Sequence, residues 1–164
     1  MRLSRVKNLA GRIKQFHHFK IPYARFASWN ADCSSFTCMS CHGESVLVVE
    51  DDEGLAQVIA LALRAEGFEA QTAHDGVDGY ASYFNHPTDW VVTDIQMPEL
   101  DGIGMMECIR AINPSVRAIY ISGAVDEYRV PLERETKQFA ARVLRKPFSR
   151  SSLLEQLTAE TKDG

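Results

Sequence analysis

The stretch VVTDIQMPELDG, residues 91–102, decides the fold, because a short apolar run ends there in a carboxylate that is followed by a turn. Val91 and Val92 are β-branched, and such side chains suit the interior of a pleated sheet. We therefore predict a buried strand that ends at Asp94. In open α/β sheets, the loops that leave the carboxyl ends of the strands form the ligand-binding crevice. Asp94 is thus a candidate for chemistry.

From residue 45 onward, apolar runs alternate with amphipathic stretches on both sides of this strand. That alternation is typical of a parallel sheet flanked by helices. We predict strands at residues 45–50, 68–73, 90–94, 116–122 and 142–146. We predict helices at residues 53–67, 75–85, 102–112, 126–140 and 149–160. The expected fold class is α/β: a doubly wound, five-stranded parallel sheet of order 2-1-3-4-5, flavodoxin-like, flanked by five helices.

Turn and cap residues delimit several of these elements. Gly67 is expected to close the first helix, and Asn113-Pro114 to stop the third. Ser149 is a suitable cap for the last helix. Pro131 is expected to disturb the fourth.

Charge divides the chain unevenly. Residues 1–43 hold seven basic side chains and one acid, Asp32, whereas the whole chain holds 18 basic and 22 acidic groups. Residues 44–164 therefore keep 11 basic and 21 acidic groups, which would repel phosphates. The composition argues against direct nucleic-acid binding through this part and favours a site that concentrates cations.

The sequence contains no apolar run of the roughly 20 residues that a membrane span needs. The N-terminus also lacks the apolar region of a secretory signal. We therefore expect a cytoplasmic protein without a membrane span. Three of the four cysteines fall in residues 33–41 and the fourth is Cys108, so no disulfide framework is indicated.

Three acids follow two strands that are neighbours in the expected order. Glu50 and Asp51 follow the first strand, and Asp94 ends the third. Like charges that close together are unfavourable unless a cation neutralises them, and Mg²⁺ prefers such hard oxygen ligands. The alternative interpretation of acids at strand ends is solvation or helix capping, which we favour for Asp52 and Glu53.

A hydroxyl and an ammonium are expected on the same edge of the sheet. Ser122 ends the fourth strand, and Lys146 ends the fifth, directly before Pro147. Each has an ordinary explanation alone, as a turn residue or a solvated lysine. Together they can donate a hydrogen bond and pair with a phosphoryl group.

These residues resemble the response-regulator receiver domains of two-component signalling. The stretches that carry the resemblance are VLVVEDDEG, VVTDIQMPELDG, IYISG and VLRKPFS, which begin at residues 46, 91, 119 and 143. The resemblance implies that Asp94 is the phosphoacceptor, with Lys146 on the phosphoryl oxygens and Ser122 as the residue that turns toward them. It also implies a Mg²⁺ site formed by Asp51, Asp94 and the backbone carbonyl of Gln96, with Glu50 assisting through water. Pro98 and Asp101-Gly102 match the turn that follows the phosphoacceptor.

The resemblance implies a sensor histidine kinase or phosphotransfer protein as phosphodonor, and a downstream protein that the sequence does not identify. We expect a stand-alone receiver over residues 44–161, preceded by a poorly ordered basic extension at 1–43. We expect no enzyme beyond self-phosphorylation from small donors and self-dephosphorylation. The alternatives are a pseudo-receiver that binds partners without phosphorylation, and a phosphohydrolase, which generally needs a second Asp at the position of Gln96.

Two features depart from the family pattern. Val143 occupies the position, three residues before Lys146, where an aromatic side chain usually couples to the phosphorylated state. The segment before the fifth strand reads KQFAA, residues 137–141, in place of the usual Gly-Ala. These departures leave the aromatic part of the switch and the placement of the fourth helix open.

The extension allows several further interpretations. CMSCH, residues 38–42, matches a haem c attachment pattern, but neither a signal for export nor a surrounding haem-binding sequence accompanies it. Cys33, Cys38, Cys41 and His42 have the residue types of a Zn²⁺ site. Residues 3–16 place apolar side chains on one helical face, as a membrane-surface or partner helix would. The interpretation that we favour is an extension without a packed core.

Overall fold

The computed structural model describes residues 43–159. The predictions for the basic extension, its cysteines and residues 3–16 fall outside these residues, and the domain limits 1–43 and 44–161 stay predictions. Within the described part of the chain, no helix is long and apolar enough to cross a membrane.

The sheet contains five parallel strands in the order β2-β1-β3-β4-β5, as the sequence predicted. The strands are β1 (Ser45–Val49), β2 (Glu69–Ala73), β3 (Trp90–Asp94), β4 (Arg117–Ser122) and β5 (Ala141–Arg145). The three central strands are buried almost throughout, whereas β2 and β5 at the edges are mostly half-buried. The continuous β-branched and aliphatic runs of the sequence therefore correspond to the three central strands rather than to the edge strands.

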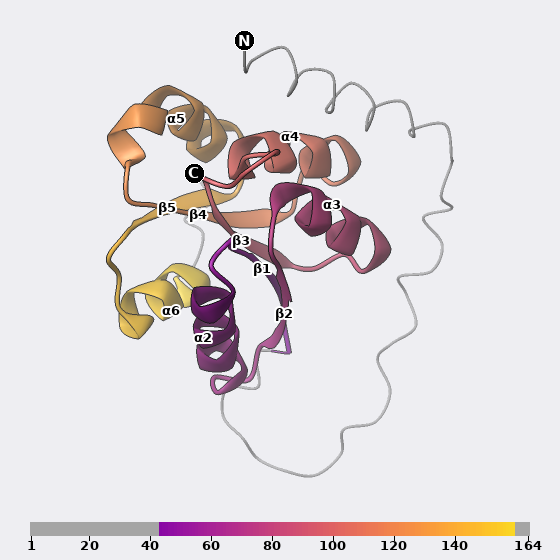
Figure 1. Ribbon diagram of the computed structural model, residues 1–164, viewed down its shortest axis with the longest axis vertical. Helices are drawn as coiled ribbons and strands as arrows, with labels where there is room; N and C mark the ends of the chain where they lie inside the picture. The colour runs from indigo at the N-terminus through magenta and orange to yellow at the C-terminus, as the bar shows by residue number, and fades with distance from the viewer. Residues whose placement is uncertain (1–42, 160–164) are drawn as a thin grey trace. The chain divides into compact units, whose positions relative to one another are not determined.

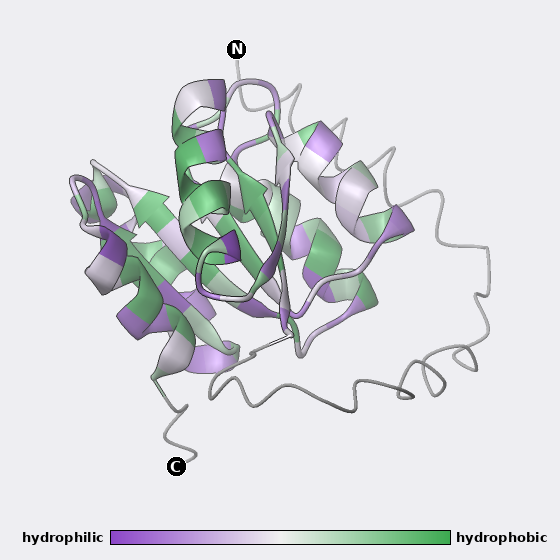
Figure 2. Ribbon diagram, turned by 90° about the horizontal axis from the view of Figure 1, so that it is seen from below, coloured by the Kyte–Doolittle hydropathy of each residue, from purple (hydrophilic) through white to green (hydrophobic). Residues whose placement is uncertain are grey.

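Five α-helices of the described residues cover the two faces of the sheet (Figure 1). Their bounds are α2 (Glu53–Arg64), α3 (Gly76–Asn85), α4 (Gly102–Ile112), α5 (Arg129–Gln138) and α6 (Arg150–Thr158). Helices α2 and α6 lie on one face, and α3, α4 and α5 lie on the other. Figure 2 shows hydrophobic residues in the sheet and on the inner sides of the helices, with hydrophilic residues outward.

The alternation of side chains along each strand divides the core between the faces. Val46 and Val48 of β1 join the cluster that packs against α2 and α6. Val49 points to the other face, where its methyl groups lie so close to Gly79 of α3 that a Cβ there would collide with them. Continuous apolar strands are thus required because both faces are covered.

The largest differences between predicted and observed helices concern α2 and the region of α5. Helix α2 ends at Arg64 rather than at residue 67, because residues 65–67 form a turn and Gly67 adopts a φ of 90°. Residues 126–140 form a 3-10 helix, Val125–Tyr128, followed by α5. Pro131 lies in the first turn of α5, where its missing N–H needs no partner within the helix.

Side-chain caps begin four of the helices. The carboxylate of Asp52 accepts a hydrogen bond from the Leu55 amide at 3.0 Å, as expected for a capping residue. The side chains of Asp75, Asp101 and Ser149 cap α3, α4 and α6 in the same way. These caps place helix N-termini after the carboxyl ends of β1, β2 and β3 and after the loop that follows β5.

Candidate functional site

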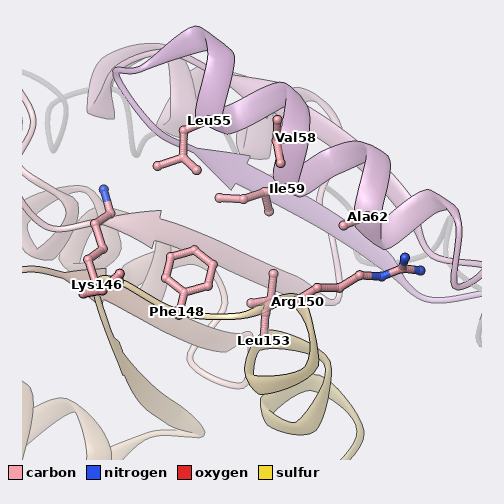
Figure 3. Close-up of a pocket in the computed structure, with 9 residues that line it drawn as sticks. Leu55, Val58, Ile59, Ala62, Lys146, Phe148, Arg150 and Leu153 are labelled. Atoms are coloured by element: carbon pink, nitrogen blue, oxygen red, sulfur yellow. The ribbon is translucent and has the colours of Figure 1, made fainter.

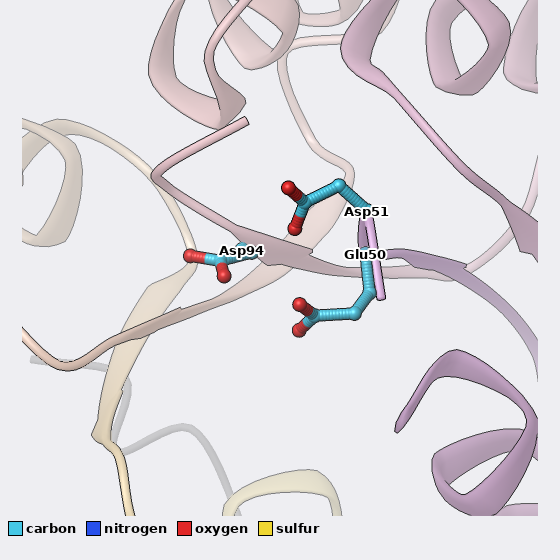
Figure 4. Close-up of side chains that lie close together, drawn as sticks. All are labelled: Glu50, Asp51 and Asp94. Atoms are coloured by element: carbon cyan, nitrogen blue, oxygen red, sulfur yellow. The ribbon is translucent and has the colours of Figure 1, made fainter. Parts of the chain in front are cut away.

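Three carboxylates meet where β1 and β3 end, side by side. The two strands pair in parallel, with Val49 opposite Thr93, so Glu50 and Asp94 follow at neighbouring positions. Glu50, Asp51 and Asp94 each place a carboxylate oxygen within 4.8 Å of the others (Figure 4). Glu50 and Asp94 are buried, whereas Asp51 is exposed. The structure thus brings together the three acids that the sequence singled out.

Lys146 joins this cluster from the end of β5. Its ammonium Nζ donates to Asp94 Oδ2 at 2.6 Å and to both oxygens of Glu50, at 2.9 and 3.1 Å. Glu50, Asp94 and Lys146 therefore form one polar group although they lie far apart in the sequence. The group depends on the pairing of β1, β3, β4 and β5.

The charges of this group shift two pKa values. Burial raises the pKa of Glu50, the Lys146 hydrogen bond opposes that rise, and the charge of Asp94 adds to it. Burial opposes the charged form of Lys146, but hydrogen bonds to Asp94 and Glu50 outweigh it and raise the pKa of the ammonium. Lys146 is therefore held as a cation where a phosphoryl group would bring negative charge.

Ser122 is fully buried at the end of β4, two strands from β1. Its carbonyl accepts from the Lys146 amide at 2.9 Å, which fixes the end of β5 beside it. Its hydroxyl oxygen accepts from the Ala124 amide at 3.0 Å. The hydroxyl is thus engaged with the loop after β4 rather than with the carboxylates.

The turn after Asp94 folds back on the site. The Gln96 amide donates to Asp94 Oδ1 at 3.0 Å, and the Gly102 amide donates to the Ile95 carbonyl at 3.1 Å. A Cβ on Gly102 would collide with the Asp94 carbonyl oxygen and with Thr93 Oγ1. A glycine is required at position 102, because α4 begins in contact with the backbone of Asp94, the phosphoacceptor candidate.

The donor set fits Mg²⁺. Three carboxylates supply hard oxygen ligands, and the exposed Asp51 leaves the cluster open on one side. The proximity of three anions to one ammonium leaves negative charge that a divalent cation would balance. The prediction that Glu50 acts through water did not include its direct ion pair with Lys146, because the sequence gives no indication of which acid a lysine 96 residues away will contact. The assignment of the Gln96 carbonyl as a ligand stays a prediction.

An apolar groove adjoins the site at Lys146 (Figure 3). Its volume is about 520 Å³, and it runs between α2 and α6. Leu55, Ile59 and Leu153 line its walls, and Phe148 lies beside Lys146. Val58, which also lines it, is 62% exposed. Sequence reasoning missed this groove, because the residues that line it match the ordinary inner face of an amphipathic helix.

Known proteins are similar to this chain in sequence. The Response regulator receiver domain family matches residues 46–158. The transcriptional regulatory protein PrrA of Mycobacterium bovis is 34% identical over 116 residues, which are 70% of this chain and 48% of PrrA. The chemotaxis protein CheY of Treponema pallidum is 34% identical over 120 residues, 71% of this chain and 82% of CheY. The chain thus spans about half the length of PrrA and most of CheY.

Solved structures of receiver domains are similar to this chain in fold. A response regulator receiver domain protein from Clostridium thermocellum is 26% identical with a TM-score of 0.63, over 70% of this chain and 90% of that one. The receiver domain of the Francisella response regulator 1452 is 28% identical with a TM-score of 0.60, over 70% and 93%. The family match covers the sheet, its helices and the acid cluster together. The chain therefore belongs to the response regulator receiver domain family of two-component systems.

Proposed function

We propose that the chain is a receiver that accepts a phosphoryl group on Asp94 from a histidine of a sensor kinase or phosphotransfer protein, in the presence of Mg²⁺. The observation that carries this proposal is the contact of the Lys146 ammonium with both Asp94 and Glu50, beside Asp51. Phosphoryl transfer between oxyanions needs positive charge of this kind at the acceptor.

The proposed step is a displacement at phosphorus. An Asp94 carboxylate oxygen attacks the phosphorus of a phosphohistidine, the P–N bond breaks, and the released imidazole nitrogen takes up a proton. The product is an acyl phosphate on Asp94. Mg²⁺, when bound by Glu50, Asp51 and Asp94, would neutralise charge on the transferred oxygens.

The residues of the chain have distinct parts in this step. Asp94 is the nucleophile, held in place through Oδ1 by the Gln96 amide. Lys146 contacts Asp94 Oδ2 before transfer and pairs with a phosphoryl oxygen afterwards. Ser122 gives up the hydrogen bond that its hydroxyl oxygen accepts from the Ala124 amide, and the hydroxyl then donates a hydrogen bond to the phosphoryl group. These exchanges convert a local charge change into a change of the loop after β4.

A protein donor is supported by the surface beside the site. The groove between α2 and α6 reaches Lys146 and Phe148. Val58 at its edge is exposed, and so is Leu61, three residues further along α2, which is 61% exposed. Apolar surface of this kind suits a protein partner better than a small phosphodonor. We further propose that the chain is a signalling domain with no turnover beyond self-phosphorylation from small donors and self-dephosphorylation.

Acetyl phosphate tests the acceptor directly. With Mg²⁺, intact-mass measurement of the wild type is expected to show one added phosphate, while Asp94→Asn shows none and wild type with a chelator shows none. Glu99→Gln, an exposed acid of the same turn, is the matched control and should be labelled like the wild type. Labelling of Asp94→Asn at the wild-type level would refute the assignment. A wild type that is never labelled but still binds a partner would favour the pseudo-receiver.

A further inference from the structure

A buried ion pair anchors the second half of α5 to the sheet and to α4. Glu135 of α5 and Arg110 of α4 are 6% and 5% exposed. Glu135 Oε2 accepts from Arg110 Nε at 2.8 Å and from the Tyr120 hydroxyl of β4 at 2.7 Å. One carboxylate oxygen thus ties three elements together.

Glu135 is the counter-ion of Arg110 and accepts from the Tyr120 hydroxyl, and Arg110 makes further contacts. Arg110 Nη1 donates to the Val116 carbonyl at 2.9 Å, and the guanidinium lies 4.2 Å from the centre of the Phe139 ring. Arg110 Nη2 is buried and finds no acceptor among the described residues. Burial and the hydrogen bond to Glu135 raise the pKa of Tyr120. Its hydroxyl therefore stays protonated and donates the hydrogen bond to Glu135. Removal of Glu135 would leave a buried cation without its counter-ion.

The first half of α5 is held differently. Neither α5 nor the 3-10 helix before it begins with a side-chain cap. The ion pair of Asp126 with Arg145 joins side chains that are 83% and 56% exposed, and exposed pairs of this kind contribute little. Val130 is 76% exposed. Residues 123–131 therefore have fewer fixed contacts than the residues that follow.

Tyr120 links this anchor to the phosphorylation site. Side chains two positions apart on a strand share a face, so Tyr120 and Ser122 lie on the same side of β4. Ser122 holds the start of the loop through the Ala124 amide, and Tyr120 holds the end of α5 through Glu135. The segment from Gly123 to Pro131 lies between these two attachments.

We propose that Glu135 is a positioning residue that divides α5, so that phosphorylation of Asp94 moves residues 123–131 and leaves residues 132–138 in place. This inference rests on the proposed function. The release of the Ala124 amide by Ser122 frees only the first attachment, and the Arg110–Glu135–Tyr120 anchor stops the change from spreading along the helix. Residues 132–138 thus stay fixed while residues 123–131 move against them. This arrangement does not need an aromatic side chain at position 143, where the chain has Val143.

The test compares amide chemical shifts with and without Mg²⁺ and beryllium fluoride, a mimic of the phosphoryl group. In the wild type, large changes are expected at residues 123–131 and small ones at 132–138. In Glu135→Gln and in Tyr120→Phe, the mean change at residues 132–138 should rise about twofold or more. Glu133→Gln is the matched control, because it removes an exposed carboxylate of the same helix that pairs with Arg129 and Lys137. It should retain the wild-type distribution.

The outcomes separate this inference from the proposed function. A wild type that shows no change at any residue, together with no labelling by acetyl phosphate, overturns both. A labelled wild type whose changes extend evenly over α5, or a Glu135→Gln protein with the wild-type distribution, overturns the inference alone. A purely structural anchor would lower stability in Glu135→Gln without redistributing the changes. If that variant fails to fold, Tyr120→Phe decides by the same criterion, since it removes only a hydroxyl.

Discussion

At the scale of single residues, Gly102 acts through the backbone that it contacts. The space that a side chain would occupy there is filled by the Asp94 carbonyl and Thr93 Oγ1. The sequence predicted the Asp-Gly turn, but only the structure shows that the carbonyl in question belongs to the phosphoacceptor candidate itself.

Gly102→Ala is therefore expected to lower the free energy of unfolding by about 1–3 kcal/mol, the usual cost of overpacking. It should also slow labelling of Asp94 by acetyl phosphate, because the backbone that carries the nucleophile must shift. Urea denaturation and intact-mass measurement check the two effects. Gly123→Ala is the control for stability, since a Cβ there meets nothing within 4 Å. Equal stability of the two variants would contradict this account.

The site residues could be predicted to different extents. Asp94, Glu50 and Asp51 follow apolar runs, so their place at the strand ends could be derived from the pattern alone. The direct contact of Lys146 with Glu50 could not, because it depends on the side-chain geometry at strands that lie far apart in the sequence. Glu135 gave no signal at all, since a glutamate in a charged amphipathic stretch is usually solvated.

At the scale of the elements, the caps and turns determine where the helices begin. The Asp75 carboxylate accepts from the Val77 amide at 2.7 Å and from the Asp78 amide at 2.8 Å. Two of the amides that the first turn of α3 leaves without intrahelical partners are thus satisfied by one side chain. The sequence placed the start of this helix one residue early, at the cap itself.

Asp75→Ala is expected to lower the free energy of unfolding by about 1 kcal/mol, as the loss of an N-cap usually does. Asp75→Asn should retain most of that stability, because its side-chain oxygen accepts the same hydrogen bonds. Thermal and urea unfolding of the three proteins provide the measurement. If Asn and Ala proved equally destabilising, the charge of Asp75 rather than its hydrogen bonds would be the cause.

Elements with continuous apolar runs were predicted best. Strand β3 and helix α4 have the bounds that the sequence indicated, because Trp90–Asp94 is buried throughout and Asp101 caps the helix. The region of α5 was predicted less well. Its residues are mostly polar and Pro131 suggested a disturbance, whereas the fixed geometry of the ring suits a first turn.

At the scale of the whole molecule, the described sheet begins at Ser45, and every residue assigned to the chemistry lies between Glu50 and Lys146. Removal of residues 1–43 is expected to change the free energy of unfolding by no more than about 1 kcal/mol, as for changes away from a packed core. The Mg²⁺-dependent labelling rate of Asp94 should stay within a few-fold of the full chain.

Thermal unfolding and acetyl phosphate labelling of both proteins, at low and at physiological salt, check this expectation. The salt series matters because residues 1–43 carry a positive excess and the remainder a negative one, and screening weakens such attraction. A shortened protein that fails to fold, or that loses labelling at physiological salt, would show that the domain boundary is misplaced.

The contact between Lys146 and the two acids has a consequence for how the protein is made. The chain is synthesised from its N-terminus, so Glu50 and Asp94 leave the ribosome well before Lys146 does. Parallel strands pair only after long segments have closed, and β5 is the last strand along the sequence to join the described sheet. A nascent chain that ends before residue 146 therefore lacks the ammonium that contacts Glu50 and Asp94. If the proposed function holds, competence to accept a phosphoryl group is expected only once the segment that follows β5 has been synthesised.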